Sequence, residues 1–379
     1  MIDRNRLAKT FESLVTIDSP SREEARVVEH LKNIFIPLGG AAWVDDAGEK
    51  VGGNTGNLIV TFPGNRPAPP IFFNAHMDTV TPGKGIRPIF KEGVFTSDGT
   101  TILGADDKSA IAVLVEVMRV LIENDLPRSP IELVFTVCEE IGLLGAKYFD
   151  TRSLQSTFGY ALDATNTAGI VTRAPGANRL TFTVLGKDAH AGAAPEKGIN
   201  AIYIASTAIS GLKLGRLDPE STCNIGVIHG GLAKNIVPGK VEVEGEVRSH
   251  NPATLARETE RMVAAFESAV KSFPQQDIEA GLPKLETLVE SEFAATHIPD
   301  DHPVVQLTKQ AAGNLRREMK PTVTGGGADA NIFFERGLFT GVLGTGMKDM
   351  HTLRESIALD DMVLAAELVL EIIRLHSVS

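Results

Sequence analysis

The N-terminal segment carries its hydrophobic side chains at helical spacing. Apolar residues recur along one helical face at Leu7, Phe11, Leu14 and Val15. This period predicts an amphipathic helix with one buried side. Ser21 and Glu24 form a capping-box pattern, so we expect a second helix to begin there and to reach about Phe35.

The pattern then changes to short, almost continuous apolar runs bounded by turn residues. These runs are NLIVTF at 57–62, IFFN at 71–74, IELVFTV at 131–137 and YAL at 160–162. Their lengths and compositions predict buried strands. Residues 109–124 carry apolar side chains on overlapping helical faces, which predicts a mostly buried helix. Buried strands that alternate with helices favour an α/β sheet covered on both faces.

The chain changes character again from about Gly176. Leu180, Phe182 and Val184 alternate with polar residues, as in a strand with one buried face. We expect a helix over 198–214, strands near 222–228 and 237–247, a helix over 252–272 capped by Asn251, and a strand near 285–290. This order, β-α-β-β-α-β, is that of the ferredoxin-like split unit.

Helix and strand patterns of the first kind return after this unit. We expect Asp300 or Asp301 to cap a helix to about 319, a strand over 338–343, and an amphipathic C-terminal helix from Asp360. The sequence therefore predicts an α/β fold, with a mixed sheet flanked by helices, that is interrupted by an inserted ferredoxin-like α+β lid. We place the catalytic domain at 1–176 and 293–379, and the lid or dimerisation domain at 177–292.

The composition is that of a folded protein and narrows the set of partners. Hydrophobic residues make up 43% of the 379 residues, which is too many for a disordered chain. The formal net charge of −11 disfavours binding to nucleic acid or to anionic membrane surfaces. No apolar stretch approaches the ~18 residues of a membrane span, and the charged N-terminus has no signal-peptide core. We therefore expect a cytoplasmic protein.

Acidic and imidazole side chains directly follow the predicted strands. They are His76 and Asp78 after IFFN, Glu139 and Glu140 after IELVFTV, Asp163 after YAL, and His351 in the loop after the strand at 338–343. Asp106 stands in GADDKSA, immediately ahead of the buried helix. Open α/β sheets bind ligands beyond the carboxyl ends of their strands, so we expect these side chains on one rim. Clustered acids raise one another's pKa, so such a group indicates a cation among them.

The balance of ligand types indicates a pair of divalent metal ions. Two imidazoles with three carboxylates suit Zn²⁺, Mn²⁺ or Co²⁺ better than Mg²⁺ or Ca²⁺, and Zn²⁺ is the first expectation. One carboxylate can bridge the two ions, which leaves Glu139 without a metal and able to act as a base. Each residue alone has an ordinary explanation as a turn, cap or surface group. Only their joint placement after strands favours a site.

Four motifs carry a resemblance to a known family. SDGTTIL followed by GADDKSA, the HMDTV segment, CEEIGLLGA and the late MHTLRE resemble the dinuclear zinc peptidases that include peptidase T, carboxypeptidase G and aminoacylase. Within that family the chain is most similar to peptidase T and shorter peptidase T-like proteins, through TSDGTTILGADDKSAIA and GGGADANIF. The resemblance extends over most of the chain and includes the lid.

The resemblance implies a metal-binding role for five positions. One ion would be held by His76 and Asp163, and the other by Glu140 and His351. Asp106 would bridge the two ions. These roles agree with the ligand types expected from the residues themselves.

Two further residues of the rim take roles from the resemblance. Glu139 would be the general base. Asp78 would accept a hydrogen bond from a ligand imidazole, as metal-bound histidines require. The resemblance also implies a cis peptide bond between Asp106 and Asp107.

Four further residues would meet the substrate, three of them in the lid and Gly327 in the catalytic segment that follows it. His190 in DAHAGAAPEKGINA would stabilise the oxyanion or contact the substrate, and Asn235 lies in GGLAKNIVPG. Arg248 in GEVRSHNP would bind a substrate carboxylate. Gly327 in GGGADANIF would line the pocket with its backbone amide. His190 as an ordinary surface residue, and Arg248 paired with a nearby acid, remain alternatives.

The expected activity is that of an exopeptidase. We predict an aminopeptidase that releases the N-terminal residue of tripeptides or other short peptides, with a homodimer through the lid as a possible assembly. One alternative is a metal-dependent amidase or deacylase of N-acyl amino acids. Another, from a different class, is a catalytically silent metal-binding scaffold.

Overall fold

The computed structural model describes residues 1–378, which divide into two compact units. Unit 1 contains Met1–Arg173, His297–Thr324 and the chain from Ala328 onward. Unit 2 contains Ala174–Thr296 together with Gly325–Gly327. Unit 1 is an α/β unit and unit 2 is an α+β unit inserted into it, so the predicted fold class is confirmed.

The central sheet of unit 1 is mixed. Its strands are β1 (Ala41–Val44), β2 (Leu58–Phe62), β3 (Ile71–His76), β6 (Ile131–Thr136), β7 (Phe158–Ala164), β8 (Gly169–Ala174), β16 (Thr296–His297), β17 (Lys320–Val323) and β18 (Phe339–Gly344). The order is β1-β2-β6-β3-β7-β18-β8-β16, and β17 pairs with β8. Strands β6, β3, β7 and β18 run parallel, so their carboxyl ends lie at one edge of the sheet.

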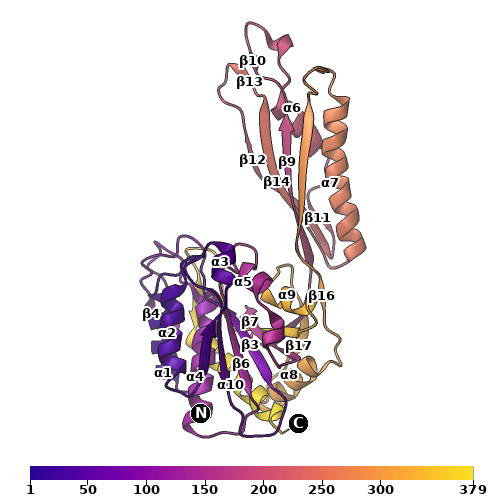
Figure 1. The fold of residues 1–379 in the computed structure, drawn as a ribbon. Helices are drawn as coiled ribbons and strands as arrows, with labels where there is room; N and C mark the ends of the chain where they lie inside the picture. Colours follow the sequence, from indigo (N-terminus) through magenta and orange to yellow (C-terminus); the bar gives the residue numbers. More distant parts are fainter. Residues whose placement is uncertain (379) are drawn as a thin grey trace. The chain divides into compact units, whose positions relative to one another are not determined.

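Helices cover both faces of this sheet (Figure 1). They are α1 (Arg4–Val15), α2 (Ala25–Phe35), α3 (Ala47–Val51), α4 (Ala105–Glu123), α5 (Leu144–Tyr148), α8 (Pro303–Asn314), α9 (Asp329–Glu335) and α10 (Leu359–His376). A small sheet of β4 (Ile89–Lys91), β5 (Val94–Thr96) and β19 (Ser356–Ala358) completes the unit.

Strand β3 shows why its first three residues are apolar. Phe72 meets Phe333 of α9 edge to face at 5.6 Å between ring centroids, while its neighbour Phe73 stacks on Tyr160 at 5.8 Å. Successive side chains of a strand point to opposite faces, so both faces of β3 are packed. The central strands are thereby fixed, and their carboxyl ends have defined positions.

Unit 2 is a curved antiparallel sheet with two helices. Its strands are β9 (Gly176–Leu185), β11 (Gly215–Asp218), β12 (Ser221–Gly230), β14 (Lys240–Ser249) and β15 (Lys284–Phe293), in the order β11-β12-β14-β9-β15. Helices α6 (Ala201–Ser210) and α7 (Pro252–Ser272) pack on it, and Figure 1 shows α7 as the long orange helix beside the strands. Strands β10 (Ala189–His190) and β13 (Ile236–Val237) form a separate pair.

The core of unit 2 forms around stacked aromatic rings. Phe182 of β9 lies 3.9 Å from Phe266 of α7, with their planes nearly parallel. Asn251 accepts hydrogen bonds from the amides of Ala253 and Thr254, so α7 begins with the cap that the sequence predicts.

Two predicted helix starts were wrong. Helix α2 begins only at Ala25; Ser21 Oγ donates to Asp78, and the Glu24 carboxylate accepts from the Cys138 amide, so this pair forms no capping box. Helix α8 is capped by His302 rather than by Asp300 or Asp301, and it ends at Asn314. At α2 both polar side chains have partners far away in sequence, and at α8 it is the His302 ring that accepts the N–H of Val304 in place of an aspartate.

Candidate metal centre

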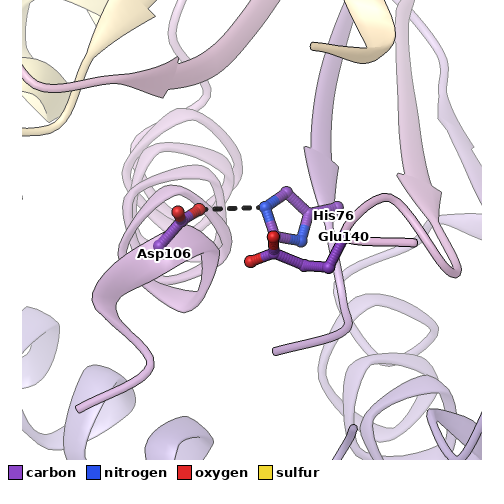
Figure 2. Close-up of side chains that lie close together, drawn as sticks. All are labelled: His76, Asp106 and Glu140. Carbon is purple, nitrogen blue, oxygen red and sulfur yellow. Dashed lines mark hydrogen bonds and ion pairs between the residues drawn. The ribbon is translucent and has the colours of Figure 1, made fainter. Parts of the chain in front are cut away.

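The candidate site lies at the carboxyl ends of the parallel strands of unit 1. His76 ends β3, Glu139 and Glu140 follow β6, Asp163 lies near the end of β7, and Asp106 lies at the start of α4. Ligand atoms of His76, Asp106 and Glu140 all lie within 4.8 Å of one another, as do those of His76, Asp107 and Asp163. Figure 2 shows the first of these groups.

His76 is buried and has both ring nitrogens close to acceptors. Its Nε2 atom lies 3.0 Å from Asp106 Oδ1, the contact drawn as a dashed line in Figure 2. Its Nδ1 atom lies 3.0 Å from the backbone oxygen of Asp78 and 3.4 Å from Asp78 Oδ1. Nε2 therefore faces the acid cluster, while Nδ1 is in contact with Asp78 on the other side of the ring. This is the arrangement of a metal-ligating histidine.

His351 approaches the same carboxylate from the other side. Its Nε2 atom lies 3.1 Å from Asp106 Oδ2 and 3.1 Å from Glu140 Oε2. The side chain of His351 is 52% exposed, whereas those of Asp106 and Glu140 are buried. The two oxygens of Asp106 thus lie between two imidazoles, and the His351 side of the cluster is open to solvent.

Asp107 is a member of the cluster to which the sequence assigned no chemical role. Its Oδ2 atom accepts the backbone N–H of His76 at 3.2 Å, and its Oδ1 atom is buried without a hydrogen-bond partner in residues 1–378. The Asp106–Asp107 peptide bond is cis, as the family resemblance implies. Asp107 therefore adds a second buried carboxylate directly beside Asp106.

Asp78 holds the turn that follows β6. Its Oδ1 atom accepts the backbone N–H of Glu139 at 3.0 Å, and its Oδ2 atom accepts that of Glu140 at 3.2 Å. Ser21 Oγ donates to Oδ2 at 2.6 Å. A single buried carboxylate therefore orients two consecutive acidic residues through their backbone, and it also lies close to His76 Nδ1.

The acids of the cluster are strongly perturbed. Burial raises the pKa of Glu139 and Asp163 well above the usual carboxyl range, and burial also raises the pKa of Glu140. Burial would raise the pKa of Asp106 as well, but hydrogen bonds from His351 and His76 lower it below its usual value. Hydrogen bonds to Asp106 and Glu140 raise the pKa of His351 to about 10. The imidazolium forms supply positive charge that a bound cation would replace.

The donor set fits divalent cations. Glu140 Oε1 and Asp107 Oδ1 are buried oxygens without a hydrogen-bond partner among the described residues. Buried carboxylate oxygens of this kind are costly unless something positive meets them. Nitrogen and oxygen ligands that converge at a strand rim provide such a place.

Three further buried acids surround the cluster and were missed as site residues. Thr136 Oγ1 donates to Asp329 Oδ2, Asp329 Oδ1 has no partner within the described chain, and burial raises the pKa of Asp329 to about 6. Glu24 accepts from the Cys138 amide, and Glu355 accepts from the loop before Asp106. For Asp329 and Glu355 the signal was available in GGGADANIF and MHTLRE, whereas Glu24 stands in a segment without a catalytic pattern.

Cys138 is inert in this setting. Burial and the neighbouring charge of Glu24 raise the pKa of its thiol far above the usual range. A thiolate nucleophile at this position is therefore excluded at neutral pH.

The predicted lid residues lie in unit 2. His190 is exposed, and its Nδ1 atom accepts the backbone N–H groups of Gly192 and Ala193 at 3.2 and 3.1 Å, which leaves Nε2 facing outward as the donor. Asn235 lies beside it, because its backbone oxygen accepts the N–H of Ala191 at 2.9 Å. His190 also lines a cavity of about 640 Å³ within unit 2.

Arg248 and Gly327 have identifiable packing partners. The Arg248 guanidinium forms an ion pair with Glu246 Oε2 at 3.0 Å, which is the alternative raised by the sequence. A Cβ atom on Gly327 would lie 2.3 Å from the ring of Phe293, so any larger residue would force that ring to move. Both residues therefore have structural reasons for their identity besides any contact with substrate.

Comparisons with known proteins identify the family. The sequence profile of the family described as "Peptidase dimerisation domain" matches residues 172–274, and that of "Peptidase family M28" matches residues 57–190. Peptidase T of Fusobacterium nucleatum is 30% identical over 77% of this chain and 69% of its own length. The chain therefore belongs to the peptidase T family of metallopeptidases, which are hydrolases.

Two solved structures agree with this assignment over their full length. The crystal structure of aminopeptidase PepT from Bacillus cereus is 38% identical with a TM-score of 0.87, and it covers 100% of both chains. The crystal structure of a tripeptidase from Staphylococcus aureus is 37% identical with a TM-score of 0.92, again over 100% of both chains. Both the inserted unit and the sheet that carries the candidate site are thus part of the shared fold.

The helices of residues 1–378 were also compared with the requirements of a bilayer. None of them combines the length and the apolar composition that crossing a membrane demands.

Proposed function

We propose that this protein is a dinuclear metal-dependent exopeptidase that removes the N-terminal residue from tripeptides or other short peptides. The observation that carries the proposal is the Asp106 carboxylate, which has His76 on one oxygen and His351 on the other, while the same His351 nitrogen also contacts Glu140. The similarity to structures titled as an aminopeptidase and a tripeptidase supports the substrate class.

The donor set supports two ions, which we assign as Zn²⁺, with Mn²⁺ or Co²⁺ as substitutes. His76 and Asp163 would hold one ion, Glu140 and His351 would hold the other, and Asp106 would bridge them. When bound, such a pair lowers the pKa of a water from ~15.7 towards ~7 and polarises the scissile carbonyl.

Glu139 is the residue we assign to proton transfer. Its side chain is buried at the rim, and its backbone is fixed by Asp78, so the carboxylate is held beside the ligands without being needed as one. Glu139 would take the proton from the attacking water and return it to the nitrogen of the departing amine. The water oxygen forms a new bond to the carbonyl carbon, the peptide C–N bond breaks, and the products are a carboxylate and the protonated amine.

Residues of unit 2 would recognise the rest of the peptide. His190 Nε2 would donate to the developing oxyanion or to the substrate, a contribution of about 3 kcal/mol for one such donor in other enzymes. Arg248 would exchange Glu246 for the terminal carboxylate of the peptide, with Asn235 and the Gly327 amide as further polar contacts. We expect domain motion between open and closed states during turnover.

Two properties of the whole protein belong to the same proposal. The match of residues 172–274 to a peptidase dimerisation domain supports a homodimer through unit 2. We propose a cytoplasmic location as the setting in which short peptides would be the substrates.

The test is a substrate panel assayed for free amine release. Tripeptides, dipeptides and N-acetyl amino acids should separate the three hypotheses, and we expect tripeptides to be cleaved fastest. Preferential cleavage of acetyl amino acids would favour a deacylase, and no turnover of any substrate by metal-loaded protein would favour a scaffold.

A single substitution tests the role of the base. Glu139→Gln keeps the size of the side chain but removes its capacity to accept a proton. We expect both metals to stay bound while hydrolysis falls by about 10²–10⁴-fold. Unchanged turnover with full metal content would show that another group takes the proton.

A further inference from the structure

The carboxylate of Glu355 is buried and accepts hydrogen bonds from three backbone amides. Its Oε2 atom accepts the N–H groups of Leu103 and Gly104 at 2.7 and 2.8 Å, and its Oε1 atom accepts that of Asp106 at 3.0 Å. The residue is 1% exposed. A charged acceptor that satisfies three buried donors is a strong and directional contact.

These amides belong to the loop that leads into α4 and carries Asp106. Gly104 adopts a left-handed conformation with φ of 76°, and Asp106 and Asp107 have non-helical dihedral angles although they lie inside the bounds of α4. The start of this helix therefore lacks the regular backbone geometry that would fix its first residues. The Glu355 carboxylate holds this segment instead, because it accepts the backbone N–H groups named above.

Glu355 also connects two segments that are distant in sequence. It follows His351 by four positions, and its own backbone N–H donates to Thr352 at 3.1 Å. His351 in turn lies 3.1 Å from Asp106 Oδ2. The turn at 351–355 therefore contacts Asp106 twice. The His351 imidazole contacts the side chain of Asp106, and the Glu355 carboxylate contacts its backbone N–H.

We propose that Glu355 is a positioning residue that sets the place of Asp106 relative to His351, and that it raises the affinity of the centre for metal without touching a metal itself. The proposal rests on the proposed function, since it assigns Asp106 and His351 as ligands. Partners behind a ligand typically change metal affinity by about 10–100-fold when they are lost.

The substitution Glu355→Gln tests the carboxylate with little change in volume. An amide has one oxygen, so it can accept at the Oε2 position or at the Oε1 position but not at both. Keeping the two bonds to Leu103 and Gly104 turns the NH₂ group towards the N–H of Asp106, where two donors face each other. The least costly orientation therefore disturbs Asp106 itself.

Glu132 provides a matched control. Its buried carboxylate likewise accepts loop amides, those of Gln155 at 2.9 Å and Ser156 at 3.0 Å. It lies near the start of β6, whereas the candidate site follows the end of that strand. Glu132→Gln therefore removes the same kind of hydrogen bond at the opposite end of the sheet.

The experiment measures Zn²⁺ affinity by competition with a chromophoric chelator, on full-length wild type, Glu355→Gln and Glu132→Gln. We expect about 10–100-fold weaker binding for Glu355→Gln and wild-type binding for Glu132→Gln. In the metal-free proteins, hydrogen exchange of the amides of 103–106 should be faster in Glu355→Gln alone. Fluorescence of Trp43 checks that both variants are folded.

Two results would overturn the proposal. One is wild-type affinity and wild-type amide exchange in Glu355→Gln. The other is an equal loss of affinity in Glu132→Gln, which would mean that any weakening of the sheet lowers metal binding. Wild-type protein that binds no Zn²⁺ would instead refute the proposed function, and the exchange of the 103–106 amides would still decide whether Glu355 holds this loop.

Discussion

Glu24 is a buried acid whose titration should be visible in the stability of unit 1. Its Oε1 atom accepts the backbone N–H groups of Arg22 and Cys138, each at 3.0 Å, whereas Oε2 is buried with no partner among residues 1–378. Burial, with a further contribution from the charge of Asp78, raises the pKa of Glu24 to about 7 from 4.5. The perturbation we consider is Glu24→Gln.

The sign and size of the effect follow from linkage. The folded state binds the proton of Glu24 more tightly than the unfolded state, so the stabilisation that Glu24 contributes is fully present below pH 4.5 and is lost as pH rises through about 7. The rise in the pKa of Glu24 corresponds to roughly 3 kcal/mol at ~1.4 kcal/mol per pKa unit. Gln does not titrate and keeps the accepting oxygen. The free energy of unfolding of the Glu24→Gln variant, relative to that of the wild type, should therefore increase by roughly 2–3 kcal/mol between pH 5 and pH 8.

Urea unfolding at the two pH values measures this difference. Trp43 is the only tryptophan of the chain and lies in β1 of unit 1, so its fluorescence reports the unit that contains Glu24. A chelator should be present, because bound cations would lower the pKa of nearby acids. Any constant cost of burying the amide cancels between the two pH values. A stability difference between variant and wild type that is the same at pH 5 and pH 8 would refute the reasoning.

Two further predictions concern metal removal and packing in unit 2. Dialysis against a chelator should abolish peptide hydrolysis, and Zn²⁺, Mn²⁺ or Co²⁺ should restore it whereas Ca²⁺ should not; full activity in the metal-free protein would contradict the assigned ligands. Gly327→Ala should destabilise the protein by about 1–3 kcal/mol in thermal unfolding, because the new Cβ would overlap the Phe293 ring. Adding Phe293→Leu to the same chain should recover part of this loss.

Much of the fold could be predicted from the sequence because hydrophobic periodicity reports burial directly. The apolar runs at 57–62, 71–74 and 131–137 correspond to β2, β3 and β6, and α7 spans the residues that its pattern and cap indicate. Strands such as β4, β5 and β19 were missed because three residues cannot display an alternation. These strands are defined by their pairing, and the partner residues of β19 and β5 lie more than 250 positions apart in the sequence.

The acids and imidazoles of the candidate site could be predicted because parallel strands bring their carboxyl ends to one edge. Glu24 and Glu355 could not be found in the same way, since they act through backbone N–H groups, which every residue carries. Ser21 and Glu24 illustrate the limit. Their spacing is typical of a helix cap, but tertiary contacts with Asp78 and Cys138 take both side chains away from the helix end.

Asp106 and His351 lie 245 positions apart, with unit 2 inserted between them, although their side chains are in contact. On the ribosome, His76 and Asp106 emerge well before His351 and Glu355 are translated. A nascent chain that has completed unit 2 still lacks these partners and cannot assemble the centre proposed here. If the centre works as proposed, hydrolysis begins only once the final segment has been synthesised, and partly translated chains are inactive.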